Sequence, residues 1–566
     1  MRKIYLLTLS SFLLAETLPP AQSPLNLGYE TQKQTKQTKE QITSLQKKLS
    51  TIEKIEIEKK KEQIEQTNLG PNFTLNGVSI KGNTTFKQEE IILFVKPYVG
   101  KKVYTKTLQE IAQKITALYY SKGYVTSKCV LPQQNVKNGN VLFQIIEDKL
   151  GAIALSGENA HNYNTKIFLK HFKELQGKII NADELNEKLR LLKYLPISKI
   201  SPTLSKVRPG VSNLILKISE SKQRISLNVN NMGSQYSGLY RTTLTGNINN
   251  IAGISDSLSL SFTTTQMPHN YSSLSASYRH PIGDNGAKIL WAISQLNYQL
   301  DPDEIGTDTV FYDGDSSAFT LQIQKPIFLF DRVNIWLSAG FDYKDLTSKT
   351  IQNNNGDILV NSVDKTSVIT LGTNIDFVDE FKGYNALSLK IAQAIPNLFN
   401  SMSQEDIDRK TYRIENEDDF ASLAKKGPVK YGDNLSANFN KIYFSASRQQ
   451  YLPKEFTMNF SFSGQYTSRR IPQAYEYSTG DYGFGASTGI YHNLMTTFLQ
   501  LGVTYSYTRV YEYDLNLDLD TLYNRSSGVT LNIFYEDFYT TLSYASSLEE
   551  WDSSTENIKF SLGYSW

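Results

Sequence analysis

The feature that most constrains this 566-residue chain is a series of segments in which apolar and polar residues alternate strictly. These segments recur from about Ser221 to the last residue. Alternation with a period of two predicts β-strands with one apolar and one polar face, because successive side chains of a strand point to opposite sides. The polar positions are mostly Ser, Thr, Asn and Gln. The clearest segments are residues 257–262, 319–324, 456–463 and 499–507.

Strands of this kind fit a membrane-spanning β-barrel better than a soluble β-sandwich. A sandwich shows the same alternation, but its strands are shorter and its outward face carries more charge. The stretch 221–566 would allow sixteen strands of about 22 residues each with their connections, which suits an outer-membrane barrel. The alternation reaches the terminal Trp566, as in the closing strand of such barrels. Tyrosine, with 35 residues, is the most frequent aromatic and favours a surface between lipid and water.

The N-terminus has the pattern of a secretory signal peptide over residues 1–23. Arg2 and Lys3 supply the charged start, and residues 4–15 form an apolar core that is too short to cross a bilayer as a helix. Cleavage is expected near Ala15 or near Ser23. No later segment holds 18 consecutive apolar residues, so we expect an exported protein whose strands, if it lies in a membrane, do the spanning.

Residues 24–72 are expected to form a helix followed by a linker. The stretch 31–66 lacks Gly and Pro and is rich in Lys, Glu and Gln. Its apolar residues recur at intervals of three and four, as in one stripe of a helix: Ile42, Leu45, Leu49 and Ile52. The sequence Asn-Leu-Gly-Pro-Asn at 68–72 then predicts the linker.

Two units of similar size precede the alternating region, and both show the order strand, helix, helix, strand, strand. The first unit spans 73–148, with predicted helices at 89–94 and 108–119. The second spans 149–220, with predicted helices at 167–175 and 182–192. One order of elements found twice predicts a tandem repeat of two α+β domains.

Composition argues against nucleic-acid binding, metal binding and catalysis. The 59 Lys and Arg nearly balance the 56 Asp and Glu, so there is no basic excess. Cys129 is the single cysteine, which excludes an intrachain disulfide and a cysteine-based metal site, and the five histidines lack metal-ligand spacing. Residues 485–489 spell G-x-S-x-G, but no helix or suitable His follows, and we interpret them as loop glycines. We expect no enzyme activity and no cofactor.

Short motifs cluster in the first unit and at the end of the second. They are Ile80-Lys81-Gly82-Asn83, Tyr98-Val99-Gly100-Lys101, residues 120–127 with Gly123-Tyr124, Leu131-Pro132-Gln133-Gln134, Gly139, Ile146-Glu147 and Pro209-Gly210. With Asn231-Met232-Gly233-Ser234 at the start of the alternating region, the chain resembles the haemolysin secretion/activation family, the outer-membrane transporters of two-partner secretion. The positions that match the POTRA domains of that family are Gly82, Gly123, Tyr124, Leu131, Pro132, Gln133, Pro209 and Gly210.

The resemblance implies a membrane β-barrel of about 16 antiparallel strands (221–566), preceded by two α+β POTRA domains and an N-terminal helix. It leaves open whether this helix plugs the pore or lies free in the periplasm. It also implies a loop folded back into the barrel with an Arg-Gly-Tyr/Phe motif at its tip. The best match is Tyr482-Gly483-Phe484 after Gly480, with Tyr where Arg is expected. An Arg would pair with an acidic wall residue, whereas Tyr only forms hydrogen bonds.

By the same resemblance, the protein is expected in the bacterial outer membrane, in contact with its lipid and with the POTRA domains in the periplasm. It would bind an unfolded secreted partner through these domains and export it through the barrel without nucleotide hydrolysis. The implied client is a large haemagglutinin-, haemolysin- or adhesin-like exoprotein. Two alternatives remain. A barrel-assembly factor of the same superfamily usually carries more POTRA repeats, and a passive porin would not need them.

Overall fold

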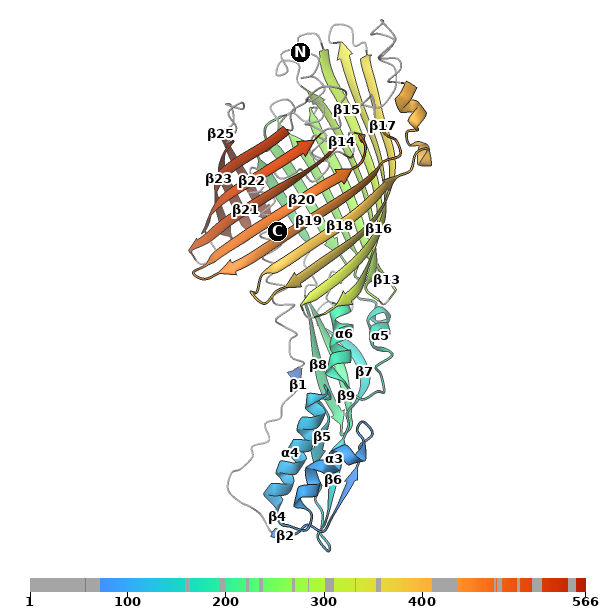
Figure 1. Cartoon of the computed structure of the whole chain (residues 1–566), viewed down its shortest axis with the longest axis vertical. Helices are drawn as coiled ribbons and strands as arrows, with labels where there is room; N and C mark the ends of the chain where they lie inside the picture. The colour runs from blue at the N-terminus through green and yellow to red at the C-terminus, as the bar shows by residue number, and fades with distance from the viewer. Residues whose placement is uncertain are drawn as a thin grey trace.

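The molecule is elongated, with a β-barrel at one end and two small domains in line beyond it (Figure 1). The computed structural model describes residues 56–57, 72–157, 160, 163–192, 199–219, 223–233, 238–266, 270–283, 285–300, 310–330, 332–352, 358–409, 435–472, 475, 481–495, 499–511, 522–547 and 556–566. The predicted signal peptide lies outside the described residues. The predicted N-terminal helix and linker (24–72) also lie outside them, apart from Asn72 and Glu56–Ile57. Glu56–Ile57 form a short strand paired with a sheet edge and not the predicted helix.

The alternating region forms a closed barrel of sixteen described strands, each antiparallel to the next. The first strand pairs with the last from Ser226↔Ser565 to Asn230↔Ser561, which closes the sheet. The predicted membrane β-barrel is therefore confirmed. The strands are β10 (Arg224–Asn230), β11 (Arg241–Asn249), β12 (Ser257–Thr265), β13 (Tyr271–Ile282), β14 (Ala287–Leu300), β15 (Val310–Leu329), β16 (Val333–Gln352), β17 (Ile358–Val378), β18 (Tyr384–Ala394), β19 (Asn440–Leu452), β20 (Phe456–Thr467), β21 (Tyr482–Met495), β22 (Leu499–Tyr511), β23 (Leu522–Tyr535), β24 (Phe538–Ser547) and β25 (Glu556–Ser565).

The strand register places apolar side chains on the outer face of the barrel and small polar side chains in its lumen. On β12, Leu260 is 43% exposed and lies on the outer face with Phe262. On the lumen side, Thr530 is only 1% exposed and its hydroxyl lies 3.2 Å from that of Ser543 on the next strand. Hydrogen bonds between neighbouring hydroxyls satisfy these buried polar groups, whereas the outer face matches lipid.

Strands β15, β16 and β17 are longer than the others. They have 20, 20 and 21 residues, and in Figure 1 they project beyond the other strands at the end far from the small domains. A transmembrane strand needs about 9–11 residues, so the projecting parts lie outside the hydrocarbon core. The ion pair between Lys365 and Asp345, at 2.9 Å, lies in this projecting wall.

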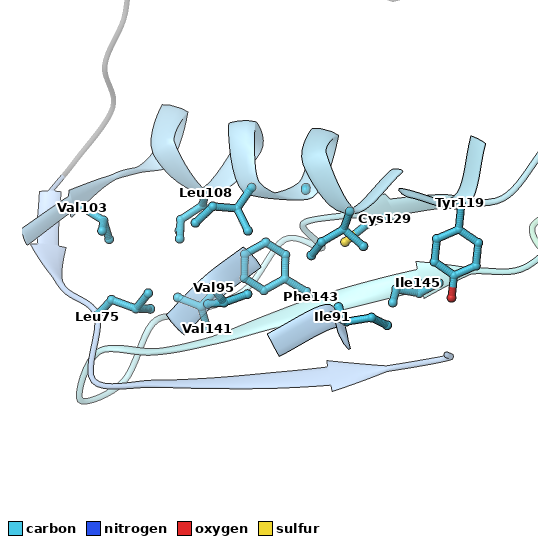
Figure 2. Packing of buried hydrophobic residues seen from close by; sticks show 13 residues of the cluster. Leu75, Ile91, Val95, Val103, Leu108, Tyr119, Cys129, Val141, Phe143 and Ile145 are labelled. Atoms are coloured by element: carbon cyan, nitrogen blue, oxygen red, sulfur yellow. The ribbon is translucent and has the colours of Figure 1, made fainter. Parts of the chain in front are cut away.

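The first small domain, Asn72–Ile146, packs two helices on a three-stranded sheet. Strands β3 (Gly77–Lys81) and β6 (Asn140–Ile146) are parallel, and β5 (Lys128–Val130) lies antiparallel on the far side of β6. Helices α3 (Gln88–Val95) and α4 (Thr105–Ser121), the turn η2 (Lys96–Tyr98) and the short pair β2 (Asn72–Thr74) and β4 (Lys102–Tyr104) complete it. Figure 2 shows the core between α4 and the sheet, where Ile115 and Phe143 are fully buried.

The second small domain, Lys149–Ser219, repeats this topology. Its elements are β7 (Lys149–Ser156), α5 (Thr165–Phe172), α6 (Ala182–Leu192), β8 (Lys199–Arg208) and β9 (Val211–Ser219). The first strand again pairs in parallel with the last, and the order of elements is the predicted one. Phe168, Phe172 and Leu214 form the centre of its core.

Within the described residues, no helix combines the length and apolar content needed to cross a membrane.

Candidate functional site

Two places bring together the residues that bear on function. One is the junction between the two small domains, where four of the eight predicted motif residues lie. The other is the barrel lumen, which receives the connection between β20 and β21. We call residues 468–481 the inner loop; the structure describes 468–472, 475 and 481 of it.

Glu147 follows β6 and anchors the first small domain. Its carboxylate accepts hydrogen bonds from the backbone N–H groups of Thr84 and Thr85, both at 3.0 Å, and from the Tyr119 hydroxyl at 2.8 Å. The Thr84 hydroxyl is a further donor. Burial raises the pKa of Glu147, but these donors outweigh burial and the net pKa lies below the usual value. The anion therefore holds the loop before α3 against α4.

Asp148, the next residue, anchors the second small domain. Its two carboxylate oxygens accept hydrogen bonds from the Gly210 backbone N–H and the Ser212 hydroxyl, each at 3.0 Å. Gly210 has a φ of +82° in the turn between β8 and β9, a conformation that favours glycine. Pro209 and Gly210 are thus turn residues at the junction, and two consecutive carboxylates each hold one domain.

Gly123 and Tyr124 lie on the same junction. The Gly123 carbonyl accepts a hydrogen bond from the N–H of Ala182 at the start of α6, at 2.8 Å. A Cβ on Gly123 would come within 3.0 Å of the Asn181 side chain, so a larger residue would crowd the second domain. The Tyr124 ring packs edge-on against those of Phe86 and Tyr119, with centroids 6.1 Å apart in both pairs.

The remaining motif residues of the first domain shape its sheet. Gly82, at the end of β3, has a φ of +85°, and a Cβ there would overlap the Ile145 carbonyl oxygen. Leu131 packs on the core, Pro132 is half-buried and Gln133 is exposed. The more specific contacts come from Gln134, whose amide bonds both the N–H and the carbonyl of Leu142, at 2.7 and 2.8 Å. Gln134 thereby covers part of β6 beyond the end of β5.

The sheet of the second small domain holds an added strand. Residues Glu56–Ile57, labelled β1, pair in parallel with β8 at Thr203 and Leu204. They belong to the segment before the first domain, so an extended piece of polypeptide lies on a sheet edge to which it is not adjacent in sequence. Main-chain hydrogen bonding of this kind tolerates many sequences.

The inner loop enters the barrel and packs on its wall. Ile471 and Tyr475 are buried against Val368 of β17 and Ala392 of β18, and the Phe439 ring lies 5.5 Å from that of Tyr475. The Ile471 N–H donates to the Asp481 carboxylate at 2.8 Å. The described part of the loop is therefore folded on itself inside the lumen.

Cations of the barrel wall hold this loop. The Lys441 ammonium donates to the Tyr475 carbonyl at 3.2 Å and lies 4.8 Å from the centre of its ring. The Lys344 ammonium lies 4.2 Å from the same ring. The Gln465 amide bonds the carbonyls of Tyr475 and Asp481 at 2.9 and 3.0 Å. We call Lys344, Lys441, Gln465 and Tyr475 the loop anchor.

The structure corrects the prediction for Tyr482, Gly483 and Phe484. They lie at the start of strand β21 and pair with β20 and β22, so they belong to the barrel wall and not to a loop tip. Gly480 is outside the described residues. The Tyr482 ring stacks on that of Tyr511 at 4.9 Å. The physical reason is that the apolar residues Tyr482, Phe484 and Ala486 recur at every second position, as on one face of a strand.

The glycines of the G-x-S-x-G sequence are also strand residues, not loop residues as predicted. Gly485, Ser487 and Gly489 all lie on β21, and Ser487 is buried with its hydroxyl beside that of Ser461.

The sequence analysis did not predict the loop anchor. The available signal was a Lys at a lumen position of a strand, as at Lys344 and Lys441. Within the described residues, no cluster of His, Cys, Asp and Glu is suited to a metal.

Two protein-family models match the chain. A model described as POTRA domain, ShlB-type, matches residues 73–148. A model described as haemolysin secretion/activation protein ShlB/FhaC/HecB matches residues 210–483. Together they cover the first small domain and most of the barrel.

Curated relatives and solved structures agree with these matches. The heme/hemopexin transporter protein HuxB of Haemophilus influenzae is 22% identical over 408 residues, which are 71% of this chain and 66% of the relative. The outer membrane transporter CdiB of Dickeya dadantii is 22% identical over 413 residues, with the same shares. The match thus spans just under two thirds of each relative's length. The structure of CdiB from Escherichia coli has a TM-score of 0.64 at 16% identity, covering 96% of this chain and 99% of that one.

Proposed function

Because the chain belongs to the haemolysin secretion/activation family of outer-membrane transporters, we propose that it exports a secreted partner protein across the outer membrane. In this proposal the small domains bind the unfolded client in the periplasm and the barrel conducts it outwards. The client is a large exoprotein of the haemagglutinin, haemolysin or adhesin kind. We expect no enzymatic activity, because the named relatives are transporters.

The observation that carries the proposal is the added strand on β8. An unfolded client offers free backbone N–H and C=O groups along its whole length, and a sheet edge pairs with them whatever the side chains are. The pairing of Glu56–Ile57 with Thr203 and Leu204 supports an edge at β8 that accepts an extended segment. The client would exchange with this segment, which keeps the edge covered until a client arrives.

Passage then requires a polar lumen and a movable obstruction. Hydroxyl and amide side chains such as Thr504, Ser526 and Asn532 line the barrel and solvate an extended chain without strong binding. The loop anchor joins the inner loop to the wall through a few hydrogen bonds and ring–cation contacts, so its release costs little compared with unfolding the barrel. Folding of the client outside would make the movement irreversible, with no need for a nucleotide.

The experiment that tests client binding is site-specific photo-crosslinking in cells that secrete a cognate exoprotein. A photoreactive residue at Thr203, on the β8 edge, is expected to capture the client. The same residue at Lys217, exposed on the central strand β9, is the matched control and should capture far less. Equal capture at both positions, or capture at neither, would refute strand addition at this edge.

A deletion of residues 73–220 tests the role of the small domains. We expect the barrel to insert and secretion to stop. A passive porin would lose none of its conductance, and normal secretion would show that the pore alone recognises the client. A fall in the amounts of other outer-membrane barrels would instead support an assembly factor.

A further inference from the structure

A cavity of about 470 Å³ lies where the second small domain meets the nearer end of the barrel. Helices α5 and α6 and the residues beside them form one wall, and the end of β15 with Asn285 forms the other. Figure 1 shows both helices directly below the barrel turns. The volume falls within the range of about 300–1,000 Å³ that small-molecule sites usually have.

The barrel wall of this cavity belongs to the lipid-facing surface. Phe328 pairs with Ile335 of β16. Ile335 lies two positions before the exposed Leu337 and therefore on the same outer face, which places Phe328 on that face too. Phe328 and Phe330 are 49% and 59% exposed, and their rings stack at 5.9 Å. Exposed aromatic side chains at a strand end are typical of the boundary between hydrocarbon and headgroups. The cavity therefore opens to the outside of the barrel and not to its lumen.

The opposite wall is charged. Lys170 of α5 and Lys188 and Arg190 of α6 line the cavity together with Glu174 and Glu187. Lys188 lies 3.5 Å from Glu174, whose side chain is 77% exposed. An ion pair with one largely exposed partner adds little stability, so Lys188 can exchange Glu174 for a stronger anion at little cost. The cations outnumber the carboxylates at the point where the apolar wall ends.

We propose that this cavity binds a glycerophospholipid of the inner leaflet. The phosphate lies against Lys170, Lys188 and Arg190, and an acyl chain follows Phe328 along the outer wall. Only an amphiphile with an anionic head and an apolar tail matches both walls, and a client that passes through the lumen does not reach this face. Each basic side chain near an anionic headgroup adds to the attraction. The bound lipid braces the second small domain against the barrel. This inference requires a membrane-inserted barrel but not the export of a client.

Native mass spectrometry of the full chain in mild detergent, with dioleoyl phosphatidylglycerol as the probe, tests the proposal. The double variant Lys170→Gln, Lys188→Gln should retain at least fivefold less lipid than the wild type. Lys166→Gln, which removes one positive charge from α5 outside the cavity, is the control and should retain the wild-type amount. Phe328→Ser should also weaken retention. Heat-modifiable migration on a gel verifies that each barrel is folded.

Two results would overturn the proposal. One is equal lipid retention in the double variant and in Lys166→Gln. The other is complete displacement of the lipid by inorganic phosphate alone, which would assign the cations to a soluble anion and remove the role of the apolar wall.

Discussion

The small domains and the barrel bury opposite kinds of side chain. In the first small domain, Ile115 and Phe143 are fully buried and the exposed surface is largely polar. In the barrel, Thr530 and Ser561 are buried and Leu260 and Val503 are exposed. The two halves of the chain bury different kinds of side chain because their surroundings differ. Water surrounds the small domains, whereas lipid surrounds the barrel and polar groups fill its interior. Burial therefore identifies a residue's role only when the solvent is known.

Removing a large apolar side chain should have the strongest effect in the water-facing domain. Phe143→Ala leaves a cavity in the core of Figure 2, and we expect a loss of about 3–5 kcal/mol in its stability. Limited proteolysis of the full chain should then cut within 72–146 while the barrel remains heat-modifiable. The exposed Lys137→Ala is the control and should not change cleavage. Loss of the barrel along with the domain would show that the two halves do not fold independently.

The mirror experiment places a charge on the lipid-facing surface. Val503→Arg, at a residue 60% exposed on β22, should cost about 2–4 kcal/mol near the middle of the bilayer. Urea titration of the folded barrel in lipid vesicles measures the change. Ser275→Arg, which points into the lumen between Ser261 and Ser294, should cost much less. Equal losses would mean that the assignment of the two faces is wrong.

Packing within the lumen gives a smaller effect. The Tyr491 ring lies over Gly502, where a Cβ would come within 2.3 Å of it. Gly502→Ala should therefore destabilise the barrel by about 1–3 kcal/mol through overpacking. Gly246→Ala is the matched control, since a Cβ there meets nothing within 4 Å. We expect Tyr491→Ala to relieve the effect of Gly502→Ala in the double variant, as measured by the same titration.

The loop anchor should respond to the loss of one cation without loss of the barrel. Lys441→Gln removes a charge-assisted hydrogen bond and a ring contact, together about 1–2 kcal/mol. We expect more frequent high-conductance openings in a planar bilayer as the inner loop detaches. Lys390→Gln removes a lumen cation that lies over Tyr443 instead of the loop, and its openings should match the wild type. Identical traces for both variants would argue against the anchor.

The smallest expected effect is a pH dependence of the first small domain. The pKa of Glu147 is lower in the folded state than in the unfolded chain, so the unfolded state binds the proton more tightly. The stabilisation is therefore complete above the unfolded pKa and is lost as the pH falls through the folded value. Proteolysis within 72–146 should increase in acid, and Glu147→Gln should reduce that pH dependence. An unchanged dependence in the variant would assign the effect to other carboxylates.

Local patterns were sufficient for the barrel and for the repeated domain topology. The alternation at 257–262 or 499–507 specifies strands, because the side-chain period of a strand is two residues wherever the strand lies. The two helical stripes of each small domain likewise marked α3 to α6. Tyr482-Gly483-Phe484 is similar to the family's loop motif, but apolar residues at every second position indicate the strand that the structure shows.

Relations between distant residues required the tertiary structure. Asp148 and Gly210 are 62 positions apart, and Lys441 and Tyr475 are 34 apart. Neither pair has a spacing that a periodic pattern predicts, because such contacts depend on how the domains and the barrel wall close around them. The cavity between α6 and β15 exists only after the two units meet, so its cations and its aromatic wall look unrelated along the chain. Periodicity reports the solvent on each face of an element, whereas the partners on that face are set by packing in three dimensions.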